Sequence, residues 1–158
     1  MCNSMNNVLI KKVINPTKEI LNLTTEWMFN WWGIEGKYSY NDVFTYMTNS
    51  FNESKLPQTY LLFLGDTIIG MYQFTYRDLF IRPDIYPWVA NLYIDKRYRG
   101  QGYGRILIES VKNQARNNTD FDKLFLYSNH DNLYERFGWK CIDIVDVNGN
   151  KLYELDLK

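Results

Sequence analysis

Residues 97–107 read Arg-Tyr-Arg-Gly-Gln-Gly-Tyr-Gly-Arg-Ile-Leu, with glycine at positions 100, 102 and 104. Glycines at alternate positions carry a steep backbone-entropy cost, which a ligand that needs bare backbone would offset. The stretch follows an apolar strand-type run and precedes apolar residues at helical spacing. Exposed N–H groups in a strand-to-helix turn bind phosphate, because the helix N-terminus adds partial positive charge. The alternative is a glycine-rich turn with solvated arginines.

Two other phosphate-binding loops do not fit this spacing. A Walker loop needs Gly-Lys-Ser/Thr at its end, which is missing. A dinucleotide-binding fingerprint needs glycine where Arg105 stands and an acid at the end of the next strand, whereas Asp122 precedes its strand. What remains is a pyrophosphate-binding turn, in which Arg99 and Arg105 add charge-assisted contacts.

The rest of the chain alternates strand-type and helix-type segments. Asn15–Pro16 is expected to begin the first helix, which Gly33 ends, and Ser39 with Asp42 forms a capping box for the second. Hairpins are expected about Gly65–Asp66 and Asn148–Gly149. The expected strands are 8–14, 59–64, 67–76, 88–95, 123–128, 140–147 and 151–157, with a helix after the glycines and a short one at 133–137. The order β-α-α-β-β-β-α-β-α-β-β predicts a mixed α/β fold in a single domain, residues 1–158.

Composition narrows the class of protein. Lysines plus arginines and aspartates plus glutamates number 18 each, which argues against a nucleic-acid partner, since such domains are strongly basic. The N-terminus lacks a signal-peptide profile, and no apolar run reaches membrane-spanning length. Cys2 and Cys141 are the only cysteines and sit in no metal-ligand spacing. We expect a cytoplasmic protein with no membrane partner and no metal.

Residues 99–104, Arg-Gly-Gln-Gly-Tyr-Gly, resemble the Q/R-x-x-G-x-G/A motif of the GNAT superfamily of acyl-CoA-dependent N-acetyltransferases. Residues 132–139, Asn-Leu-Tyr-Glu-Arg-Phe-Gly-Trp, are similar to the LYEKxGF segment that follows in that family, and the element order is the family's order. The resemblance implies acetyl-CoA as co-substrate, in a cleft where the strand 88–95 splays from 123–128 at a β-bulge. It implies cofactor contacts from Leu92, Tyr93, Ile94, Arg99, Gly100, Gln101, Gly102, Tyr103, Gly104, Arg105 and Asn129. The connection 128–132 is shorter than the family's, so either Asn129 or Asn132 could contact the pantetheine.

The chemistry that the resemblance implies is direct attack of an amine on the thioester, without a covalent enzyme intermediate. Tyr134 is then the general acid, since a phenol is still protonated when a thiolate of lower pKa leaves. The alternative for Tyr134 is packing of the short helix. The base is left open among Glu35, Asp78 and Asp84, each of which is more often a solvated loop acid, and His130 is more often structural than proton-handling.

The acceptor side is expected among the loops that line acceptor sites in this superfamily. Aromatic rings there could cage a cationic amine, although most aromatics serve in packing. Trp27 and Trp31 lie on the apolar face of the first helix and are expected in the core. The expected acceptor residues are Trp32, Tyr86, Trp88, Asp84 and Glu35.

These features predict an N-acetyltransferase for a small-molecule amine. A protein or peptide acetylase and a non-catalytic CoA-binding module remain as alternatives. The exposed aromatic surface also makes a homodimer through the C-terminal hairpin an expectation.

Overall fold

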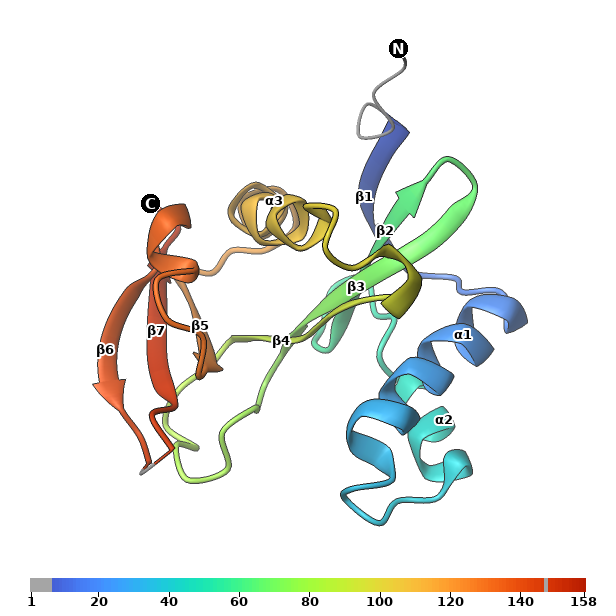
Figure 1. Cartoon of the computed structure of the whole chain (residues 1–158), viewed down its shortest axis with the longest axis horizontal. Helices are drawn as coiled ribbons and strands as arrows, with labels where there is room; N and C mark the ends of the chain where they lie inside the picture. The colour runs from blue at the N-terminus through green and yellow to red at the C-terminus, as the bar shows by residue number, and fades with distance from the viewer. Residues whose placement is uncertain (1–6, 147) are drawn as a thin grey trace.

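The computed structural model describes residues 7–146 and 148–158, which form a seven-stranded sheet with helices on both faces (Figure 1). The strand order is β1-β2-β3-β4-β5-β7-β6, with β4 and β5 parallel and every other neighbouring pair antiparallel. The strands are β1 (Val8–Val13), β2 (Gln58–Leu64), β3 (Thr67–Thr75), β4 (Trp88–Ile94), β5 (Lys123–Ser128), β6 (Lys140–Ile144) and β7 (Lys151–Asp156). The α-helices are α1 (Lys18–Met28), α2 (Tyr40–Thr48) and α3 (Tyr103–Asn118). A π-helical turn (Phe29–Gly33) and two 3-10 turns (Lys96–Tyr98 and Tyr134–Phe137) complete the chain. The predicted mixed α/β class and element order are confirmed.

Local signals set most element ends, and the structure differs from prediction at several of them. The N-cap of α1 is Thr17, whose hydroxyl accepts from the Ile20 N–H at 3.2 Å, so the helix begins after Asn15–Pro16 rather than on it. The capping box of α2 is as predicted, with Ser39 and Asp42 exchanging hydrogen bonds of 3.0 and 2.9 Å. The helix expected at 133–137 is a short 3-10 turn. Strand β6 ends at Ile144, and the predicted strand end at Val147 lies outside the described residues.

Two apolar clusters sandwich the sheet, one on each face. Tyr60 and Leu62 of β2 point toward α3, whereas Leu61, between them, points toward α1 and α2. Successive side chains of a strand alternate between faces, so a strand covered by helices on both sides reads as a continuous apolar run. Figure 1 shows α3 on one side of the sheet and the α1–α2 pair on the other.

The sheet is interrupted between β4 and β5. Trp88 and Phe125 are the aligned pair of this parallel ladder, and the Phe125 N–H donates to the Pro87 carbonyl at 3.0 Å. Beyond that pair the strands diverge toward the C-terminal end of β4. The splay of the central strands that the family resemblance implied is therefore present.

A β-bulge in β4 accompanies the divergence. Met71 of β3 aligns with Tyr93, but Gln73 aligns with Ala90, so Tyr72 alone faces the two residues Asn91 and Leu92. Asn91 takes the left-handed conformation, with φ of 54°, which asparagine tolerates better than most residues. An extra residue of this kind bends its strand and ends regular pairing.

A buried polar network holds this bulge. The Gln73 side chain is fully buried, and its Oε1 accepts from the Asn91 amide at 2.7 Å and from the Tyr46 hydroxyl at 2.9 Å. Its Nε2 donates to the Thr59 hydroxyl at 3.0 Å. Because these polar groups lie in a low-dielectric interior, each depends on its partner for satisfaction.

We expect Gln73→Leu to lower the free energy of unfolding by about 1–3 kcal/mol, because the Asn91 amide and the Tyr46 hydroxyl lose their shared acceptor. Urea denaturation followed by circular dichroism measures the change. The exposed Gln101 provides the control, since Gln101→Leu should change stability by less than about 0.5 kcal/mol. Equal stabilities of the Gln73→Leu variant and the wild type would contradict the role given to this network.

Candidate functional site

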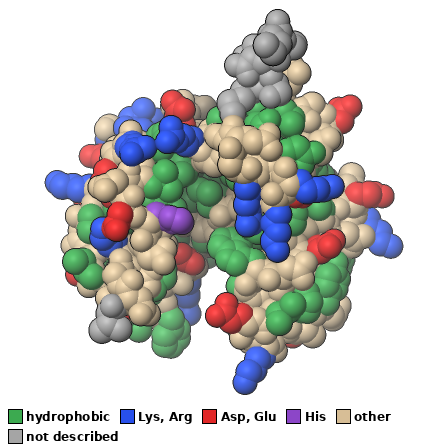
Figure 2. Space-filling model, in the orientation of Figure 1, with side chains coloured by type: hydrophobic (Ala, Val, Ile, Leu, Met, Phe, Trp, Pro, Cys, Tyr) green, Lys and Arg blue, Asp and Glu red, His purple; other side chains and the backbone are tan. Residues whose placement is uncertain are grey.

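The splay between β4 and β5 opens into two adjoining pockets. One has a volume of about 560 Å³ and the other about 1190 Å³, and Trp31 and Leu92 line both. Figure 2 shows the molecular surface hollowed between the two halves of the sheet. The pockets therefore form one cleft that passes the bulge of β4.

The smaller pocket collects most of the predicted cofactor residues. Its lining includes Leu92, Tyr93, Ile94, Arg99, Gly100, Tyr103 and Gly104. Gly102 is the N-cap of α3, with φ of 92°. Gln101 and Arg105 are exposed beside this pocket rather than part of its lining, and Asn129 lines the larger pocket instead.

The N-terminus of α3 leaves its first N–H groups without a capping side chain. Gly104 is the second residue of the helix, and glycine is a poorer helix former than alanine, by up to about 1 kcal/mol in a helix interior. Neither packing nor backbone conformation requires glycine there, because a Cβ on Gly104 would meet no protein atom within 4 Å and its φ is not positive. A ligand lying against the helix N-terminus accounts for it, and the dipole there favours an anionic one.

Arg99 is fixed at the mouth of the smaller pocket. Its Nε donates to the Ile94 carbonyl at 2.8 Å, and its guanidinium lies 5.0 Å from the centre of the Tyr93 ring. The Asp95 N–H donates to the Ile69 carbonyl of β3 at 2.8 Å. Since backbone groups alternate along a strand, those of Leu92 and Ile94 point the other way, toward the space that β5 has left, where Arg99 already occupies the Ile94 carbonyl.

Aromatic side chains line the larger pocket from both walls. On the α1–α2 wall, Trp32 meets Tyr38 and Tyr46 edge to face, with ring centres 6.0 and 5.7 Å apart. On the β5 wall lie Tyr127 and Tyr134, together with Ser128, Asn129 and His130. The single histidine is the purple side chain in the hollow of Figure 2.

A π-helical turn brings Trp31 to the cleft. The Ile34 N–H donates to the Phe29 carbonyl at 3.0 Å, one residue further than in an α-helix. Trp27 is in the core as predicted, but Trp31 is 47% exposed and lines both pockets, so its predicted core position is wrong. Its ring lies 5.6 Å from that of Tyr93. Inserted π turns of this kind are common at functional sites.

Tyr134 presents a neutral phenol to the larger pocket. The side chain is 8% exposed and packs against Trp139 and Tyr153, with ring centres 6.4 and 5.5 Å away. Burial raises its pKa above the usual value, and the Ser128 hydroxyl offsets part of this. The phenol therefore keeps its proton across the physiological range and can donate it.

Asp78, in the loop between β3 and β4, contributes a carboxylate to the same pocket. Water reaches this side chain, but the surrounding cleft walls reduce its hydration, and this desolvation raises its pKa to about 6. Among residues 7–146 and 148–158, no side chain forms a hydrogen bond or ion pair with it. A carboxyl group of this kind is ionised at neutral pH and can accept a proton.

Four of the five predicted acceptor residues lie away from the cleft lining, Trp32 being the exception. Trp88 is 0% exposed, and its indole donates to the Ile85 carbonyl at 2.8 Å in a separate apolar cluster. Tyr86 packs on the outside, against Tyr76 and Phe121. Glu35 is exposed in the connection that follows the π turn.

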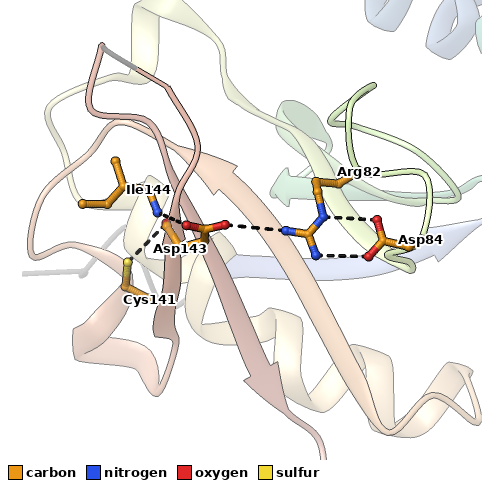
Figure 3. A network of polar contacts seen from close by, with 5 residues as sticks. All are labelled: Arg82, Asp84, Cys141, Asp143 and Ile144. Atoms are coloured by element: carbon orange, nitrogen blue, oxygen red, sulfur yellow. Dashed lines mark hydrogen bonds and ion pairs between the residues drawn. The ribbon is translucent and has the colours of Figure 1, made fainter.

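Asp84 is held in an ion-pair network (Figure 3). Arg82 donates to both its carboxylate oxygens at 3.1 Å and also approaches Asp143 of β6 at 3.7 Å. The Arg82 hydrogen bonds hold the pKa of Asp84 below its usual range. This carboxylate is already partnered on the outer face of the loop, unlike Asp78.

Within the described residues, no three His, Cys, Asp or Glu side chains gather as a metal site would require. In the same part of the chain, none of the helices has the length and apolar character needed to cross a bilayer.

Comparison with known proteins gives one family match and many similar folds. The model of the acetyltransferase (GNAT) family matches residues 18–139. A GNAT family acetyltransferase from Elizabethkingia anophelis with acetyl-CoA bound is 18% identical with a TM-score of 0.59, over 96% of this chain and 99% of that one. An aminoglycoside 6'-N-acetyltransferase complexed with coenzyme A is 10% identical with a TM-score of 0.71, over 95% and 97%. A spermidine N-acetyltransferase chimera from Vibrio cholerae is 12% identical with a TM-score of 0.70, over 96% of each.

We expect the Asp78 carboxyl to titrate near pH 6, well above Asp84, whose pKa lies below its usual range. Carbon-detected NMR of the side-chain carboxyl signals, assigned with Asp78→Asn and Asp84→Asn, measures both midpoints. Desolvation in the cleft is the cause at Asp78, and the Arg82 contact is the cause at Asp84. Coincident midpoints for the two residues would contradict this account of the cleft.

Proposed function

Since the chain belongs to the acetyltransferase (GNAT) family, we propose that it transfers an acetyl group from acetyl-CoA to the amine of a small molecule. The observation that carries this proposal is the continuous cleft, in which the two pockets meet at Leu92 and Trp31. Acetyl-CoA supplies an activated thioester. The chain's own residues bind it, orient the amine and handle the protons.

The smaller pocket suits the donor. The Leu92 backbone and the Ile94 N–H can pair with the amides of an extended pantetheine arm, as an added strand would, whereas the Ile94 carbonyl already accepts from Arg99. The uncapped N-terminus of α3 and the guanidinium of Arg99 face a pyrophosphate with complementary charge. Gly104 leaves room for that group to approach the helix backbone.

The larger pocket suits the acceptor. It joins the donor pocket at Leu92, next to the bulge residue Asn91, so an amine there can approach the end of the pantetheine arm. Positioning two reactants in one cleft supplies much of the rate, up to about 7–11 kcal/mol in the best-oriented cases. The aminoglycoside and spermidine acetyltransferases with similar folds act on small amines, which supports the same class here.

Tyr134 is the proton donor in this proposal. As the carbon–sulfur bond breaks, its phenol protonates the departing sulfur, and the raised pKa keeps the phenol neutral until that moment. A non-catalytic CoA-binding module would need neither this phenol in the cleft nor the second pocket.

We place the enzyme in the cytoplasm, where reducing conditions suit the exposed, unpaired thiol of Cys141.

The homodimer stays a prediction. Strand β6 lies at the free edge of the sheet and exposes Ile142 and Ile144, which offers a surface for a second copy.

Calorimetry should show that the protein binds acetyl-CoA and not NADH, and that Gly104→Ala weakens this binding about tenfold or more. The added methyl occupies the path of the pyrophosphate, whereas it meets no protein atom. The same change should raise the free energy of unfolding by about 0.5–1 kcal/mol, because alanine is the better helix former. Stabilisation without any loss of acetyl-CoA affinity would remove Gly104 from the donor site.

Tyr134→Phe should lower kcat by about 10²–10⁴-fold while acetyl-CoA affinity stays within about twofold, because the change removes the proton donor and keeps the ring packing. Release of free thiol in the presence of an amine panel measures turnover, and calorimetry measures affinity. Tyr76→Phe is the matched control, because Tyr76 packs against Tyr86 outside the cleft lining and should leave turnover unchanged. A Tyr134→Phe enzyme that turns over normally would assign the proton to water or to another residue.

A further inference from the structure

Resting on the proposed acetyl transfer, we propose that the acceptor is a monoamine carrying one positive charge on an aromatic or apolar body, and that Asp78 binds its ammonium and takes its proton. This acceptor would bind in the larger pocket of the same cleft. It rests on which charges in the larger pocket are free, on what the walls are made of, and on how many charges the pocket can neutralise.

The first observation is that Asp78 is the carboxylate in this pocket left without a partner among the described residues. Asp42 also lines the pocket, but its Oδ2 accepts from the Ser39 N–H at 2.9 Å in the capping box of α2. Asp78 makes no such bond. A carboxylate partly desolvated in a cleft and without a protein partner is complementary to an incoming cation.

The second observation is that tyrosines from both walls line the same pocket as Asp78. Tyr46 lies on one wall of the pocket and Tyr127 on the other. Burial first, and the Asp78 charge in addition, raise the pKa of Tyr46 to about 12. Burial and Asp146 chiefly, with a contribution from Asp78, raise the pKa of Tyr127. The Asp78 carboxylate therefore lies within electrostatic range of a phenol group on each wall.

Further aromatic surface extends from these rings along the α1–α2 wall. Trp31 and Tyr38 are about half exposed where they line the pocket, and Trp32 joins Tyr38 to Tyr46. Rings of this kind bury an apolar or aromatic body and also attract the cation at its end. A hydroxyl-rich or wholly polar amine would not bury this aromatic surface in apolar contacts.

The third observation is the charge balance of the pocket. The other charged groups in its lining are Arg77, which is positive, and Asp42, which is already hydrogen-bonded. The neutral polar rings of the lining are His130, Tyr38, Tyr46, Tyr127 and Tyr134. One free carboxylate next to an arginine neutralises one ammonium. An acceptor with several ammonium groups would meet repulsion from Arg77 and no further partner. This separates the expected acceptor from the polycations named for the spermidine and aminoglycoside acetyltransferases.

The proton account balances. The ammonium has three protons, and Asp78 takes one and later releases it to solvent. The neutral nitrogen then forms its bond to the acetyl carbon as the carbon–sulfur bond breaks. Tyr134 gives its proton to the sulfur and is restored by the second proton from nitrogen, and the third stays on the amide product.

The dependence of kcat/KM on pH tests the role of Asp78 as the base. The base works when ionised, so kcat/KM should fall about tenfold per unit as the pH drops below about 6, the pKa of Asp78. The other charged or titratable side chains that line the same pocket are Arg77, Asp42, His130, Tyr38, Tyr46, Tyr127 and Tyr134. A His130→Gln variant that keeps the limb assigns it to Asp78.

The experiment measures thiol release with 2-phenylethylamine, spermidine and kanamycin, after calorimetry has established acetyl-CoA binding. We expect kcat/KM for 2-phenylethylamine to exceed that for either polycation at least about tenfold. Asp78→Asn should lower kcat/KM for 2-phenylethylamine about 100-fold and abolish the limb near pH 6, with acetyl-CoA affinity unchanged. Asp66→Asn, in the β2–β3 turn, is the control and should match the wild type.

Each outcome bears on a different statement. A preference for spermidine or kanamycin overturns the acceptor class. An Asp78→Asn enzyme with full activity and an intact acid limb overturns the role of Asp78. Acetyl-CoA binding without acetylation of 2-phenylethylamine overturns this inference and leaves the donor site standing. Failure to bind acetyl-CoA overturns the proposed function itself.

Discussion

The hydrogen bond from the Asn91 amide to the buried Gln73 side chain holds the extra residue of β4 in its left-handed conformation. The bulge turns β4 away from β5 after the Trp88–Phe125 pair, and the Leu92 backbone and the Ile94 N–H are left without a strand partner, while the Ile94 carbonyl accepts from Arg99. A sheet interior tolerates unpaired backbone only where something else satisfies it. Ligand binding and the interrupted sheet are therefore two aspects of one constraint.

The cleft differs in polarity between its two ends. The donor pocket carries the N-terminus of α3, Arg99 and Lys96, which favour an anion. The acceptor pocket carries the unpaired Asp78, which favours a cation. Because the two pockets meet at Leu92, the reactants can be oriented by charge before they come into contact.

Local sequence signals predicted the fold and the segment that forms most of the smaller pocket, the proposed donor site, whereas the lining of the larger pocket depends on tertiary packing. The capping box at Ser39, the hairpin at Gly65 and the glycine turn are encoded by neighbouring residues, and each appears where it was expected. Three acceptor-side interpretations were not determined locally. The π turn exposes Trp31, and the core encloses Trp88. Arg82 pairs with Asp84 and not with Asp78. No periodicity in the sequence marks an inserted π turn, and two aspartates of one loop look alike until their neighbours in space are known.

The two pockets are lined by differently arranged parts of the sequence. The donor pocket comes mainly from residues 92–104, one continuous segment, whereas the acceptor walls come from segments between residues 31 and 150 that meet in space. Substitutions in the α1–α2 wall or in the loop that carries Asp78 can therefore accumulate without touching the segment proposed to bind the acetyl donor. Descendants of such a gene could exchange one amine for another through a few changes while keeping the same source of acetyl groups.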